Sequence, residues 1–80
     1  MLMKEFIEFI AKSLVDDPES VRVDEATEEN RVTLKLHGSK SDLGKVIGKQ
    51  GKTAKSMRTL FTAVAAKHNK SGHLEIEEGN

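Results

Sequence analysis

Residues 44–53 read Gly-Lys-Val-Ile-Gly-Lys-Gln-Gly-Lys-Thr, and this stretch decides how the rest of the chain is interpreted. Two glycines, Gly48 and Gly51, lie three positions apart between segments with helical hydrophobic spacing. Because glycine has no Cβ, such a pair allows a tight turn whose backbone stays open to a ligand. The candidates are a nucleotide-binding loop, a clamp for a nucleic-acid backbone and a plain turn between two helices.

A nucleotide-binding P-loop does not fit this stretch. That motif has the form G-x-x-x-x-G-K-[ST] between a strand and a helix. Gly51-Lys52-Thr53 supplies its end, but Val46 stands where the first glycine is needed. The preceding segment also has helical spacing, and 80 residues leave no room for the parallel sheet and acidic motif of such enzymes. We therefore reject this interpretation.

The segments around the loop predict alternating helices and strands. Pro18 disfavours helical geometry before it and so ends the first helix. Ser39, followed by Asp42, has the form of a helix N-terminus, and Asn69 and Gly72 are end signals for the last helix. The predicted elements are a helix over 2–14, strands over 21–24 and 32–36 joined by the polar stretch 27–30, a helix from 40 or 41 to 47, a helix over 54–65 and a strand over 74–77.

These elements predict a single α+β domain over residues 1–80, in the order α-β-β-α-α-β, with helices packed on one face of a three-stranded sheet. A chain of this size buries only a modest core, so its stability margin is small. The core is expected to include the apolar helix faces and all three aromatic side chains, namely Phe6, Phe9 and Phe61.

The net charge of zero hides a strong segregation of charge along the chain. Residues 1–39 hold five bases and nine acids, residues 40–70 hold eight bases and one acid, and residues 71–80 add three acids. The net charges of these segments are −4, +7 and −3. A basic block that contains the glycine loop points to a polyanionic partner, whereas the same lysines without the loop would indicate only a solvated helix face.

The composition gives no support to catalytic, metal-binding or membrane functions. The chain has no cysteine, and His37, His68 and His73 lie in different elements without metal-ligand spacing. Lys4 and Glu5 interrupt the apolar N-terminal residues, unlike a signal peptide, and no apolar run approaches membrane-spanning length. We expect a cytoplasmic, non-enzymatic domain without a cofactor.

Val46-Ile47-Gly48-Lys49-Gln50-Gly51 resembles the GXXG signature of the KH domain, which clamps about four nucleotides of a single strand. The order of elements resembles the type II, prokaryotic arrangement. The stretches FIEFIAKSLVDDPESVRV and LGKVIGKQGKTAKSMRTL resemble the small stand-alone bacterial KH proteins of the KhpA family. The resemblance covers essentially the full chain. It implies single-stranded RNA binding, a broad-target chaperone or post-transcriptional role, and pairing with a second copy or a larger KH-containing protein.

The resemblance places the backbone clamp on Gly48, Lys49, Gln50 and Gly51. The amides at the start of the following helix also favour an anion there, because the helix dipole is positive at that end. Three further lysines lie within a turn or two of the loop and are expected to neutralise phosphates. They are Lys45, Lys52 and Lys55.

The implied groove for bases is apolar and lies beside the clamp. Ala54 stands where many KH domains have a bulky aliphatic residue, which indicates a shallow groove with weak base selectivity. The chain has no Trp and no Tyr, so aromatic stacking on bases is nearly absent. The expected lining is Val46, Ile47, Ala54 and Met57, with Val32, Leu34 or Leu36 from the neighbouring strand.

Two other functions compete with the RNA clamp. One is a protein-interaction module with a KH-like fold, since the apolar N-terminal end (Met1, Leu2, Met3 and Phe6) and Leu60-Phe61 carry apolar surface suited to a partner. The other is a DNA-binding helix-turn-helix, whose base contacts would come from Lys55, Ser56 and Arg58. The intact loop and the basic block around it favour RNA binding over both.

Overall fold

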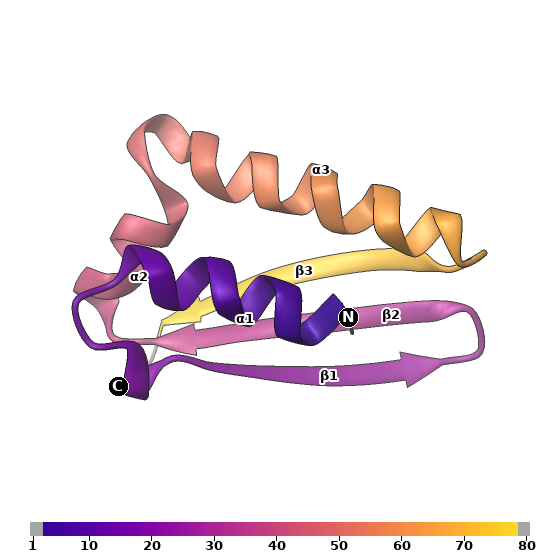
Figure 1. Ribbon diagram of the computed structural model, residues 1–80, viewed down its shortest axis with the longest axis horizontal. Helices are drawn as coiled ribbons and strands as arrows, with labels where there is room; N and C mark the ends of the chain where they lie inside the picture. The colour runs from indigo at the N-terminus through magenta and orange to yellow at the C-terminus, as the bar shows by residue number, and fades with distance from the viewer. Residues whose placement is uncertain (1–2, 79–80) are drawn as a thin grey trace.

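The computed structural model describes residues 3–78, which form three α-helices, two short 3-10 helices and three strands (Figure 1). The predicted α+β class and α-β-β-α-α-β order are confirmed. Leu2, the first residue of the predicted first helix, and Met1 before it lie outside the described residues. In chain order the elements are α1 (Met3–Leu14), η1 (Pro18–Ser20), β1 (Arg22–Glu28), β2 (Arg31–Gly38), α2 (Lys40–Ile47), η2 (Lys49–Gly51), α3 (Lys52–Lys67) and β3 (Ser71–Glu78).

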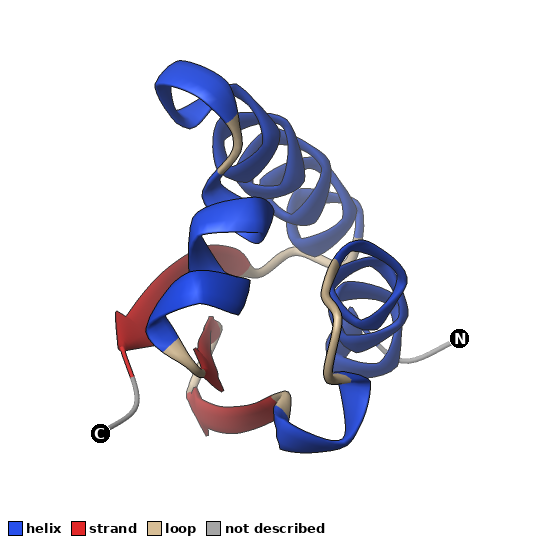
Figure 2. Cartoon of the chain, turned by 90° about the vertical axis from the view of Figure 1, so that its left-hand side faces the viewer, coloured by secondary structure: helices blue, strands red, loops and turns tan. Residues whose placement is uncertain are grey.

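The sheet is mixed and has the strand order β1-β2-β3. β1 and β2 form an antiparallel hairpin, whereas β2 and β3 run parallel, with Leu34 opposite Leu74. A parallel pair needs a crossover connection, and here α2, η2 and α3 supply it. The helices lie on one side of the sheet (Figure 2), and the other face carries polar side chains such as Thr33 and Lys35.

The hairpin differs from its prediction in the length of β1. The polar stretch 27–30 predicts a connector, but β1 continues to Glu28, and the turn consists of Glu29 and Asn30. Residues 24–28 are exposed, so this half of the strand has no buried face. Hydrophobic alternation arises from burial of one face, and it is therefore missing where the strand extends beyond the core.

The core lies between the helices and the inner face of the sheet. Phe61 of α3 and Ile7 of α1 are fully buried against Leu34 and Leu36 of β2. The assignment of all three phenylalanines to the core is wrong for Phe9, whose side chain is 69% exposed on α1. Helical spacing marks an apolar face but does not show how much of that face a neighbour covers.

Gly72 is part of β3 and does not end α3. The helix stops at Lys67, and the left-handed Asn69 (φ 61°) donates its amide to the Ala66 carbonyl at 2.9 Å, so only the Asn69 signal is confirmed. A Cβ on Gly72 would lie 3.1 Å from both Ala65 Cβ and the Phe61 ring. The missing side chain therefore allows α3 to pack closely on β3.

Candidate nucleic-acid interface

α2 begins and ends at residues that fix its direction toward the loop. The Ser39 hydroxyl accepts a hydrogen bond from the Asp42 amide at 3.3 Å, which confirms the predicted cap. At the other end Gly48 has φ 78° and ψ 176°, a conformation open essentially to glycine alone, and its amide donates to the Gly44 carbonyl at 3.0 Å. The chain thus leaves α2 abruptly and turns into the loop.

The loop over residues 48–51 projects between α2 and α3 with its two middle side chains, Lys49 and Gln50, exposed. Gln50 and Gly51 both adopt left-handed conformations, with φ 58° and 73°, and the Gly51 amide donates to the Gly48 carbonyl at 3.1 Å. A Cβ on Gly51 would meet no other atom within 4 Å. A ligand can therefore reach the backbone at Gly51 without meeting a side chain.

The start of α3 is open to an anion. Gly51 occupies the N-cap position, and no side chain caps the helix there. The first turn of a helix has amides without intrahelical partners, and the helix dipole makes this end positive. A phosphate is the kind of group that such a terminus stabilises.

The lysines around the loop differ in their freedom to bind phosphate. Lys49, Lys52 and Lys55 are exposed and make no ion pair with the described residues. Lys45, in contrast, forms an ion pair through Nζ with the Asp16 carboxylate, which follows α1 in the chain. Part of the charge that the sequence assigns to the interface is therefore compensated within the protein.

Most of the predicted groove residues lie beneath the surface. Of Val46, Ile47, Ala54 and Met57, only Ile47 is exposed, at 39%. The strand residues Val32, Leu34 and Leu36 are also fully buried. Apart from Ile47, these side chains pack in the core, so they support the surface beside the loop from below.

The family of the chain follows from comparison with known proteins. The family model described as KhpA/KhpB, KH domain matches residues 4–76, which include both glycines of the loop. The chain belongs to this family. The matched range contains the stretch Gly48-Lys49-Gln50-Gly51 on which the sequence resemblance places the loop.

Relatives named RNA-binding protein KhpA are similar to this KH domain over almost their whole length. The protein from Clostridium perfringens is 54% identical over 74 residues, which cover 92% of this chain and 99% of the relative. The Listeria monocytogenes protein is 49% identical over 76 residues, covering 95% of this chain and 100% of the relative. The Chlamydia pneumoniae protein is 46% identical over 76 residues, covering 95% and 97%.

Asp42 organises this KH domain in a way that its sequence position does not reveal. The residue is 3% exposed, and its carboxylate accepts hydrogen bonds from the backbone amides of Asp16 and Asp17, both at 3.3 Å. These bonds fasten the segment after α1 to the first turn of α2 and bring Asp16 beside Lys45. The one sequence feature that could have revealed this role is that Asp42 is the single acid in the basic block over residues 40–70.

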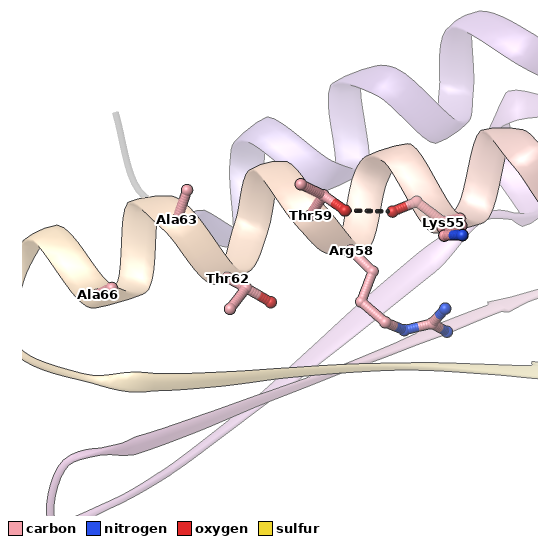
Figure 3. Close-up of a pocket in the computed structure, with 6 residues that line it drawn as sticks. All are labelled: Lys55, Arg58, Thr59, Thr62, Ala63 and Ala66. Carbon is pink, nitrogen blue, oxygen red and sulfur yellow. Dashed lines mark hydrogen bonds between the residues drawn. The ribbon is translucent and has the colours of Figure 1, made fainter.

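A second feature that sequence reasoning missed is a depression of about 510 Å³ along the outer flank of α3 (Figure 3). In it, Arg58 extends toward β3 and donates from Nε and Nη2 to the Leu74 carbonyl, at 3.4 and 3.2 Å. The sequence indicates Arg58 only as a base contact of a helix-turn-helix. The depression is lined by Lys55, Arg58, Thr59, Thr62, Ala63 and Ala66.

Within residues 3–78, no helix combines the length and the apolar character needed to cross a bilayer. Among the described residues, no group of three or more histidine and acidic side chains is placed so that it could hold a metal ion.

Proposed function

We propose that this KH domain binds single-stranded RNA, without catalysis, by clamping the sugar-phosphate backbone on residues 48–51. The observation that carries the proposal is the shape of the loop: it is free of side chains at Gly48 and Gly51, exposed at Lys49 and Gln50, and followed by an uncapped helix start. The name RNA-binding protein KhpA, borne by close relatives, supports RNA as the ligand.

The residues around the clamp contribute either positive charge for phosphates or an apolar contact for a base. Lys49, Lys52 and Lys55 neutralise phosphates, and Lys45 contributes less because Asp16 competes for it. Ile47 offers the exposed apolar contact for a base. Val46, Ala54 and Met57 keep the walls of the site in place from beneath.

A clamp of this composition favours many RNA targets over one. Contacts to phosphates fix position but carry no sequence information, and the chain has no Trp or Tyr on which bases could stack. We therefore infer modest affinity with a substantial salt-dependent part. Such binding suits a chaperone or a broad post-transcriptional regulator in the cytoplasm.

The clamp is tested by charge reversal at its tip. Binding of a mixed short single-stranded RNA is measured by fluorescence anisotropy at about 50 and 200 mM salt, for the native protein and the Lys49→Asp, Gln50→Asp variant. The control is Lys40→Asp, Ser41→Asp, which makes the same charge change at exposed positions on the opposite end of α2. Circular dichroism verifies that both variants fold.

Loss of binding in the loop variant, with binding retained in the control, supports the clamp. Equal losses in both variants would show that only the overall charge matters. Native-like binding by the loop variant would move the RNA to another surface. A duplex DNA of the same length serves as competitor, and preference for the duplex would favour the helix-turn-helix alternative instead.

A second function, pairing with another protein chain, is favoured by apolar surface on α1 and α3. Phe9 is 69% exposed and Leu60 is 50% exposed. Val64, one turn after Leu60, is 36% exposed and also lines a hollow of about 180 Å³ between α1 and α3. Large exposed apolar side chains of this kind mark interaction surfaces. The hollow is lined by Met3, Phe6, Phe61 and Val64.

We propose that this surface pairs the domain with a second KH-containing chain, either another copy or a larger protein. The test is the molar mass in solution by light scattering, with and without the Phe9→Ser, Leu60→Ser substitutions. A dimer of the native chain that the substitutions dissociate supports self-pairing. A native chain that stays monomeric, and gains no mass with a larger KH-containing protein, would rule the surface out.

A further inference from the structure

β1 forms a free edge of the sheet, and Figure 1 shows no other element beyond its middle. In an edge strand, every second residue directs its N–H and C=O away from the neighbouring strand, so these groups are free to pair with another chain. Proteins commonly block such an edge with lysine, proline, a bulge or a very short strand. β1 is seven residues long, contains no lysine or proline, and pairs with β2 residue for residue from Arg22 to Glu28. Its edge is therefore open to a fourth strand.

The side chains of β1 determine which kind of chain this edge attracts. The strand holds three acids, Asp24, Glu25 and Glu28, and one base, Arg22. Asp24 is partly compensated, because its carboxylate lies 3.3 Å from Arg22 and 3.0 Å from the His37 ring. Glu25 and Glu28 are exposed and form no ion pair with the described residues. Since successive side chains of a strand point to opposite faces, these two acids present negative charge on both faces of the edge.

A recess of about 260 Å³ lies against the middle of β1. Ala26 of β1 pairs with Thr33 of β2, and its small side chain leaves space on the open face of the sheet. The one base of the recess, Lys35, lies 3.9 Å from the Glu77 carboxylate of β3, so its charge is partly compensated within the sheet. The recess therefore offers room and acidic groups for one long basic side chain. Its lining is Asp24, Glu25, Ala26, Thr33 and Lys35.

We propose that β1 accepts an extended, lysine- or arginine-bearing segment of another protein as the fourth strand of the sheet, with one basic side chain in the recess beside Ala26. Hydrogen bonds between the two backbones supply affinity in this mode of recognition, and side chains at alternate positions supply selectivity. Glu25 and Glu28 attract basic side chains on either face of the added strand.

Other occupants of this edge carry the wrong charge. RNA phosphates are negative and are repelled by Glu25 and Glu28. A second copy of the chain would bring its own β1 or its other edge strand, β3, which holds three acids and no lysine or arginine. Figure 1 also shows the loop over residues 48–51 at the opposite border of the molecule from β1. A protein segment on β1 is therefore independent of RNA on the loop.

Titration of the ¹⁵N-labelled protein with a synthetic peptide tests the added strand directly. The probe is a capped peptide of alternating lysine and threonine, long enough to cover the seven residues of β1. The amide signals of residues 22–28 are expected to shift, and the amides of β1 that point away from β2 are expected to gain protection from hydrogen exchange. Two controls separate backbone from charge: the same peptide with glutamate in place of lysine, and spermine, which is cationic but has no peptide backbone.

Variants of β1 test the acids and the recess. Glu25→Gln, Glu28→Gln is expected to weaken binding of the lysine peptide about fivefold at low salt. Asp17→Asn, Glu75→Gln is the matched control, because it removes two exposed acids away from β1 that form no ion pair with the described residues. Ala26→Leu fills the recess without changing charge and is expected to weaken binding as well. Unchanged binding by this variant would overturn the role of the recess.

Protection of the outward β1 amides by the lysine peptide, and not by either control, supports the proposal. An unchanged spectrum with the lysine peptide would overturn it. Equal shifts with spermine would reduce the effect to charge attraction, and equal losses in the two double variants would do the same. Shifts of these amides with the mixed short RNA would assign the edge to nucleic acid instead. Protection that rises with protein concentration in the absence of peptide would assign it to a second copy of the chain.

Discussion

Thr53 occupies the space in which a side chain at Gly48 would lie. A Cβ added to Gly48 would stand 2.7 Å from Thr53 Cβ and 3.1 Å from the Thr53 amide nitrogen, and it would also overlap the Thr53 hydroxyl. At Gly51, in contrast, a Cβ meets nothing within 4 Å. The two glycines of the loop are therefore required for different reasons: Gly48 for packing and backbone conformation, and Gly51 for its left-handed conformation and for access.

This difference predicts that alanine substitution destabilises the fold more at Gly48 than at Gly51. Gly51→Ala is expected to lower the free energy of unfolding by about 1 kcal/mol, because only left-handed strain is added. Gly48→Ala adds an overlap with Thr53 and is expected to cost about 3 kcal/mol. Urea denaturation followed by circular dichroism measures both, and Gly51→Asn, which tolerates the left-handed conformation, is the control. Equal losses at the two glycines would contradict the Thr53 contact.

The ion pair between Lys45 and Asp16 predicts a variant that binds RNA more tightly. Asp16→Asn releases Lys45 and is expected to raise RNA affinity about threefold at low salt, with a smaller gain at high salt. Asp17→Asn is the matched control, because it removes the neighbouring charge but no ion pair of the described residues. Anisotropy titrations compare the two. The same gain in both variants would show a general field effect and not the release of Lys45.

The buried carboxylate of Asp42 predicts a large loss of stability on substitution. Asp42→Ala leaves the Asp16 and Asp17 amides without their acceptor, and we expect a loss of about 2 kcal/mol. Asp42→Asn is expected to be similarly costly, since its amide nitrogen cannot accept a hydrogen bond. Denaturant unfolding gives the free energies, and hydrogen exchange at residues 16 and 17 reports the local contact. Protection of these two amides that survives Asp42→Ala would refute this role.

Alanine substitution at two glycines outside the loop is expected to change the free energy of unfolding in opposite directions. Gly72→Ala pushes Ala65 and the Phe61 ring of α3 away from β3 and is expected to cost about 2 kcal/mol of unfolding free energy. Gly44→Ala lies on an exposed position of α2 with nothing within 4 Å and is expected to add about 0.5–1 kcal/mol. Thermal melting measures both shifts. Partial rescue of Gly72→Ala by Ala65→Gly would locate the strain between α3 and β3, and its absence would place the strain elsewhere.

Much of the fold was predictable because its signals are local. Ser39 caps α2 through its own side chain, and Asn69 ends α3 by its own left-handed conformation, so both signals can be read from neighbouring residues. The prediction was wrong where a residue's role depends on a distant element. Gly72 belongs to a strand because it pairs with Val32 of β2, and Phe9 is exposed because no described element covers it.

The candidate site also has features that local sequence reveals and features that depend on distant elements. The order Gly48-Lys49-Gln50-Gly51 marks the loop, since spacing of glycines and charges is a property of the sequence. The pairing of Lys45 with Asp16 spans 29 positions and exists because Asp42 holds the segment after α1 against α2. Arg58 and Leu74, 16 positions apart, meet only because β3 returns beside α3.

The sequence by itself determined the elements, their order, the family and the position of the loop. Each of these depends on hydrophobic periodicity, capping residues or glycine spacing, which act over a few residues. Only the tertiary structure decided which lysines stay free for phosphate, which groove residues are buried and where Arg58 points. Burial and ion pairing depend on which elements come together in space, and that is set by the packing of the whole core.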